Sequence, residues 1–411
     1  MTRNRILAVT VEESTYKTRT VRMEASVEAP AYFMRLLGFT QTTVRAAGMA
    51  SRRDVNLILL IDRSGSVAYA GADDEVRASA KAFVDRFSES RDRLGLISFS
   101  GAYSVDFPYG MDFKTRAPQN LGQTIDALNF PSGGAFTGSA QGLYQAYQQL
   151  VNIGEPGALN LIVFFTDGRP TALTANFPVK SLSDTRYRWD YPSSTTTYPA
   201  CPCTPPPSNK FGFIGADPCI SLPCDLYPAT GTTYGVMKAD AATSFQSEWT
   251  VAPNSSGCNY APGTGSSCPF GTCNREKMRM DIAYIPDQDH HGINIKTGYL
   301  SPDVYSSGPY AGKVRVDSPR ALRYAANNLA NNTATYIRSD AALTPVIFAI
   351  GLGGTSAEPV DHDLLLRIAN DPTSPTYVST QPTGLYVYAP TPAQLNEAFA
   401  RVASEILRLA L

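Results

Sequence analysis

The chain has 411 residues, enough for two or three domains. Hydrophobic residues make up 43% of it and charged residues 17%, so a large core can be buried. The formal net charge is −1 and no stripe of Lys and Arg with interleaved aromatic residues occurs, which excludes nucleic acid as an expected partner.

Residues 1–53 predict a small β-rich element. Hydrophobic and polar residues alternate in "RILAVTVEE", "TVRMEASVEA" and "QTTVRAAGMA", and this period of two is typical of strands. Between the last two, "PAYFMRLLG" predicts a short helix that begins at Pro30 and ends at Gly38.

Residues 54–175 predict alternating strands and helices. "VNLILLID", "RLGLISFS" and "LNLIVFFTDG" are apolar enough to be buried strands. Residues 73–88, 120–129 and 138–152 predict the intervening helices, with apolar residues on one face. This alternation predicts an α/β fold with a doubly wound, mostly parallel sheet covered by helices on both faces.

Residues 176–312 interrupt this pattern and are rich in Pro, Gly, Tyr and Thr. A structureless loop of this length is implausible, so we predict an inserted subdomain. It contains all seven cysteines, and their clustering favours local disulfides in an oxidising compartment over a zinc site, because the paired C-x2-C spacing is missing. The candidate disulfide residues are Cys201, Cys203, Cys219, Cys224, Cys258, Cys268 and Cys273.

Regular patterns return in residues 313–411, which we expect to complete the sheet domain. Ser318 and Pro319 are typical of a helix start, and the strand "TPVIFAIGLG" follows that helix. Thr391 begins a capping box, after which an apolar stripe of residues spaced three and four apart predicts a final helix packed on the sheet.

Four oxygen-bearing side chains follow two of the buried strands. Asp62, Ser64 and Ser66 come at the end of the first strand, and Asp167 comes at the end of a later one. In a parallel sheet such residues meet at one edge, where two carboxylates and two hydroxyls suit a hard cation, Mg²⁺ before Mn²⁺ or Ca²⁺. An acidic side chain of a protein partner could complete the coordination shell. The competing interpretation is that these residues only cap turns.

Asp62-x-Ser64-x-Ser66, together with the downstream Thr-Asp-Gly, resembles the metal-ion-dependent adhesion site of a von Willebrand factor A domain. The resemblance covers about residues 54–175 and 313–411 and implies a Rossmann-like fold. Such domains take a threonine ligand from a "GGTxTG"-like loop, whereas "SGGAFTGSA" places Ala135 at that position. The resemblance therefore implies that Ser132 or Thr137 supplies the oxygen, or that an extra water does and binding is weaker.

Residues 27–66 and 388–411 resemble the corresponding parts of TadG-like proteins of tight-adherence (Tad/Flp) pilus systems. This resemblance implies an exported protein of the cell envelope or surface, periplasmic or secreted. Members of the group usually begin with a membrane-anchoring segment. No apolar stretch here reaches the ~20 residues that span a bilayer, and the first residues do not form a signal peptide, so we expect export to depend on an upstream segment.

Three alternatives bear on function. "DQDHHG" offers Asp287, Asp289, His290 and His291 as a second metal site, but adjacent histidines in a polar loop are more often simply exposed. A hydrolase lacks support, because no G-x-S-x-G elbow occurs and Ser64 stands where a phosphatase of the haloacid-dehalogenase type needs an acid. We expect a non-enzymatic binding protein. The alternative is a metal-free structural component of an envelope or filament, whose Cys-rich insertion makes the contacts.

Overall fold

The computed structural model describes residues 4–13, 17–32, 34–38, 40–89, 91–130, 136–178, 209–216, 233–237, 282–316, 318–353 and 360–411. The seven cysteines, Ser132 and Ala135 lie outside the described residues. The predicted disulfides and the predicted contribution of Ser132 therefore stay predictions.

The central sheet confirms the predicted α/β class. Its six strands lie in the order β12-β11-β7-β4-β5-β6. All neighbouring pairs are parallel except β5 and β6, which are antiparallel. The strands are β4 (Val55–Asp62), β5 (Arg93–Phe99), β6 (Tyr103–Gly110), β7 (Leu159–Thr166), β11 (Val346–Leu352) and β12 (Tyr386–Ala389). The patterns above predict β4, β5, β7 and β11, but they miss β6 and β12.

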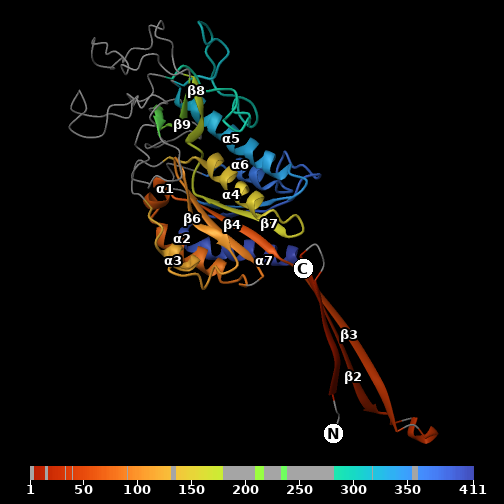
Figure 1. Cartoon of the computed structure of the whole chain (residues 1–411). Coiled ribbons are helices and arrows are strands. Elements are labelled where there is room, and N and C mark those ends of the chain that lie inside the picture. Colours follow the sequence, from red (N-terminus) through yellow and green to blue (C-terminus); the bar gives the residue numbers. More distant parts are fainter. Residues whose placement is uncertain are drawn as a thin grey trace.

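Helices cover both faces of this sheet (Figure 1). One layer holds α4 (Ser139–Ile153), α5 (Pro319–Arg338) and α6 (His362–Ala369), and the other holds α2 (Asp73–Val84), α3 (Leu121–Asp126) and α7 (Leu395–Ala410). Successive residues of β4 point to opposite layers, since Ile58 and Leu60 belong to one core and Leu57, Leu59 and Ile61 to the other. No helix in the described part of the chain is long and apolar enough to cross a membrane.

The first residues form a separate three-stranded antiparallel sheet, β1 (Asn4–Glu13), β2 (Thr18–Pro30) and β3 (Gln41–Arg53), that projects from the α/β domain (Figure 1). The predicted helix after Pro30 is only a short 3-10 helix, η1 (Met34–Leu37), because β2 runs through Pro30 itself. The sheet is anchored at its base, where Arg52 donates two hydrogen bonds to the buried carboxylate of Asp92 at 3.1 and 2.9 Å.

The described parts of the predicted insertion share a core with the α/β domain. The strands β8 (Ala172–Pro178), β9 (Asn209–Ala216) and β10 (Thr233–Met237) form a second antiparallel sheet. Residues 282–316 follow, and Ile285 and Ile295 are fully buried in the core beside α4 and α5. The domain boundaries themselves stay a prediction.

Candidate metal centre

The predicted site lies at the carboxyl ends of two adjacent strands. Asp62 is the last residue of β4, and Asp167 follows directly after β7. Strand β4 ends at Asp62, where the backbone N–H of Ser64 donates to Asp62 Oδ1 at 2.7 Å, and the short helix α1 (Gly65–Tyr69) then begins. Strand β4 has β5 on its other side, so the site lies where the strand order reverses, the usual ligand position in such sheets.

The structure brings the four predicted side chains together. The Ser66 hydroxyl donates to Asp167 Oδ1 at 2.9 Å, and the Ser64 hydroxyl lies 3.5 Å from the same oxygen. The two hydroxyls are 2.9 Å apart. Oxygens separated by about 3 Å are at the spacing that one small cation with bonds near 2.1 Å requires.

Thr166 is a member of the site that sequence reasoning did not assign. Its hydroxyl donates to Asp62 Oδ2 at 2.5 Å and thereby joins the first carboxylate to the end of β7. The signal was present in the sequence, because Thr166 is the threonine of "FFTDG" that precedes Asp167. This bond orients the Asp62 carboxylate, and the same hydroxyl is held in turn because it accepts a hydrogen bond from the Gly168 backbone N–H at 3.2 Å.

Thr137 lies on the remaining side of the site. A methyl group built on Gly168 would lie 3.5 Å from Ser66 Oγ and 4.0 Å from Thr137 Oγ1, so the two hydroxyls border the same small space. The backbone N–H of Thr137 donates to Thr171 Oγ1 at 3.0 Å, which fixes the segment before α4 against the chain that leaves β7. The part of Thr137 as a substitute for the usual threonine ligand stays a prediction.

Burial governs the electrostatics of the site. Asp62 and Asp167 are fully buried and Ser64 is 1% exposed, whereas Ser66 is half-buried. Burial raises the pKa of Asp62 to about 6, although hydrogen bonds from Thr166 and Ser64 favour the carboxylate. A cation bound here would compensate this unfavourable negative charge. Carboxylate and hydroxyl oxygens fit a hard ion such as Mg²⁺, Mn²⁺ or Ca²⁺.

The family model of the von Willebrand factor type A domain matches residues 56–188, and no curated protein matches the chain. Among solved structures, the pilus adhesin SpaC of Lactobacillus rhamnosus GG is 13% identical with a TM-score of 0.43, over 99% of this chain and 35% of that chain. This chain thus spans about a third of SpaC.

Two further solved structures are similar. The vWF domain of the type V pili tip protein Mfa5 from Porphyromonas gingivalis is 17% identical, with a TM-score of 0.42, over 88% of this chain and 98% of that one. Proximal thread matrix protein 1 from the mussel byssus, with a zinc-occupied MIDAS motif, is 11% identical, with a TM-score of 0.37, over 85% of this chain and 47% of that one. The family match and the strand order together show that this chain carries a von Willebrand factor type A domain.

Proposed function

We propose that this chain is a non-enzymatic, extracytoplasmic protein that binds a protein partner through a divalent cation held at the candidate metal centre. The observation that carries the proposal is the convergence of the Ser64 and Ser66 hydroxyls on one carboxylate oxygen of Asp167. These groups come from two adjacent strand ends. Residues that only cap their own turns would not need to meet in this way. Asp62, Ser64, Ser66 and Asp167 would hold the ion.

The charge of the site explains why a partner would bind there. Two carboxylates balance the charge of a divalent ion and leave some of its six or more coordination positions to water. An acidic side chain of the partner could replace one of these waters. Ser66 is the only one of the four residues that is more than marginally exposed, so the acidic side chain of the partner would reach the ion from the side of Ser66.

The setting we propose is the cell envelope, in Tad/Flp pilus assembly or in surface attachment. This part of the proposal is supported by the resemblance of residues 27–66 and 388–411 to TadG-like proteins. A type A domain that binds a protein through a metal ion would suit either setting.

Calorimetric titration of the EDTA-treated protein with Mg²⁺ and Mn²⁺ tests the proposal. Ser66→Ala removes one proposed ligand while Ser64 still contacts Asp167, so the variant should fold and bind the cation at least tenfold more weakly. Ser79→Ala is the control, because it makes the same substitution in α2, outside the four proposed ligands. Equal affinities of wild type and Ser66→Ala would reject the proposed ligand set.

A metal-free structural component is the second candidate, and Ala135 is the residue that favours it, since alanine cannot supply the usual threonine oxygen. The same titration separates the two. Absence of any heat of binding in the wild type would favour the structural role. Capture of a partner in Mg²⁺ but not in EDTA would favour the cation-dependent role.

A further inference from the structure

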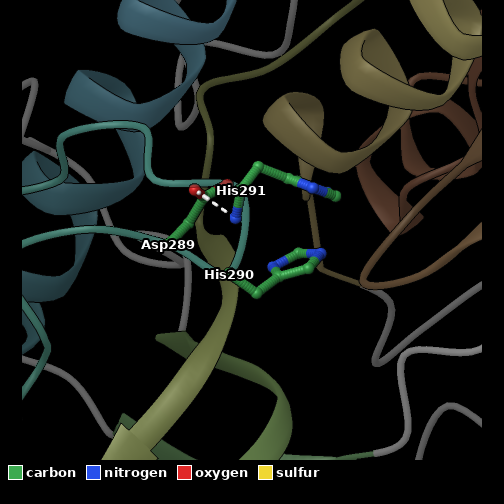
Figure 2. Close-up of side chains that lie close together, drawn as sticks. All are labelled: Asp289, His290 and His291. Carbon is green, nitrogen blue, oxygen red and sulfur yellow. Dashed lines mark hydrogen bonds between the residues drawn. The ribbon is translucent and has the colours of Figure 1, made fainter.

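Asp289, His290 and His291 form a compact group of metal-binding side chains in the segment that precedes α5 (Figure 2). One possible ligand atom from each residue lies within 4.8 Å of the others. The polar sequence around the two histidines favoured exposed side chains. The structure differs, because each of the three side chains is partly buried.

The backbone holds this group in a fixed turn. Asp289 Oδ1 accepts hydrogen bonds from the backbone N–H groups of His291 at 2.9 Å and of Ile293 at 2.8 Å (Figure 2 shows the first of these). Gly292 has a φ of +81°, a conformation that favours glycine and closes the turn. Ile293 is buried in the core, so the turn is anchored to the domain.

The two imidazole rings are held by packing. The His291 ring stacks on Tyr144 of α4, with ring centroids 3.5 Å apart and an interplanar angle of 14°. The His290 and His291 ring centroids are 3.7 Å apart. Within the described part of the chain, His291 Nε2 is buried and has no hydrogen-bond partner. A buried polar nitrogen left in this way is unfavourable, and a bound ion is one of the few arrangements that would satisfy it.

We propose that Asp289, His290 and His291 bind a divalent transition-metal ion, Zn²⁺ first, at a centre separate from Asp62. Two imidazole nitrogens and one carboxylate oxygen suit Zn²⁺ better than Mg²⁺ or Ca²⁺, which prefer oxygen ligands. Zinc bonds of about 2.0–2.2 Å bring ligand atoms to roughly 3.5 Å from one another, so closing around the ion requires side-chain movements on the order of 1 Å. Three protein ligands leave a fourth position for water or for a group from a partner.

Metal titration of wild type and two variants tests this proposal. The chain contains three histidines, and His362 in α6 provides the matched control, because its Nδ1 pairs with the Tyr386 hydroxyl at 2.7 Å, outside the cluster. In excess Mg²⁺, wild type and His362→Gln should bind Zn²⁺ with equal affinity. His291→Gln should bind it at least tenfold more weakly, while its Mg²⁺ affinity at the Asp62 centre stays unchanged.

Co²⁺ spectra identify the donor atoms and separate this centre from the cysteines. Nitrogen and oxygen ligands give weak visible bands, whereas thiolate ligands add an intense near-ultraviolet charge-transfer band. We expect the visible bands in wild type, without the thiolate band, and their loss in His291→Gln. His290→Gln serves if His291→Gln fails to fold, since Tyr144 packs on His291. Zinc binding unchanged in both histidine variants, or no zinc binding by the wild type, would overturn the proposal.

Discussion

Replacing Asp62 by asparagine separates the stability of the domain from its capacity to bind a cation. The amide has the shape of the carboxyl group, and its oxygen can still accept the hydrogen bond from the Ser64 backbone. Its NH₂ group can donate to Thr166 Oγ1, since the Thr166 hydroxyl hydrogen can turn to the Gly168 carbonyl oxygen 3.2 Å away. The variant should therefore keep the fold while losing the negative charge.

The magnitude follows from the pKa of Asp62. Burial raises it from 3.8 to about 6, so ionisation of this group favours the unfolded chain. The penalty is absent below about pH 4, grows as the pH rises from 4 to 6, and is complete above that. A shift of about two units corresponds to about 3 kcal/mol in the free energy of unfolding. We therefore compare the free energies of unfolding of Asp62→Asn and wild type without a cation. The difference between them should shift by about 3 kcal/mol in favour of the variant when the pH rises from 4 to 7.

Urea unfolding of both proteins in EDTA at pH 4 and pH 7 measures this difference. The contributions of the other titrating groups cancel in the comparison, because both proteins contain the same groups. Added Mg²⁺ should cancel most of this difference at pH 7. Wild type would gain about 2.7 kcal/mol when the ion is at 100 times its dissociation constant, and the variant would gain little. An identical stability difference at both pH values, or equal stabilisation of both proteins by Mg²⁺, would refute this reasoning.

Three further changes test the packing and the ligand set. Gly101→Ala would place a methyl carbon 2.5 Å from the Phe213 ring, so we expect it to lower the free energy of unfolding by about 1–3 kcal/mol in thermal unfolding. Adding Phe213→Leu should recover part of this loss, and additive losses in the double variant would contradict the contact. Arg52→Met leaves the buried Asp92 without its ion-pair partner and should cost about 3 kcal/mol in urea unfolding, more than Arg52→Lys does. Thr137→Val keeps the shape of the side chain and should weaken Mg²⁺ binding about tenfold in calorimetry; an unchanged affinity would remove Thr137 from the ligand set.

The sequence predicts the centre of the α/β domain well because its strands carry strong local signals. Strands β4 and β7 are eight-residue segments that are buried throughout, and such apolar runs are typical of strands covered on both faces. Once the strands are parallel, Asp62 and Asp167 must lie at the same edge of the sheet. Their approach therefore follows from strand direction and needs no knowledge of distant packing.

The edges of the sheet have no comparable signal. Strand β6 is mostly half-buried and contains Pro108, and β12 is four residues long, so neither shows an apolar run or a regular alternation. Strand β9 presents another difficulty. The contact of Phe213 with Gly101 joins segments more than a hundred residues apart, and no local pattern encodes it.

The same distinction explains why the sequence favoured one of the two proposed metal centres over the other. Asp62 and Asp167 are placed by strands that their own neighbours specify. The burial of His291, in contrast, depends on Tyr144 in α4, which is more than a hundred residues away in the chain. A pair of adjacent histidines in a polar segment therefore looks exposed until the fold brings an aromatic ring onto it. Donor chemistry then separates the two centres, because oxygen ligands alone favour Mg²⁺ while imidazole nitrogens favour Zn²⁺. A chain that holds both ions would respond to each independently. The signature of that independence would be a loss of Mg²⁺ affinity alone in Ser66→Ala and a loss of Zn²⁺ affinity alone in His291→Gln.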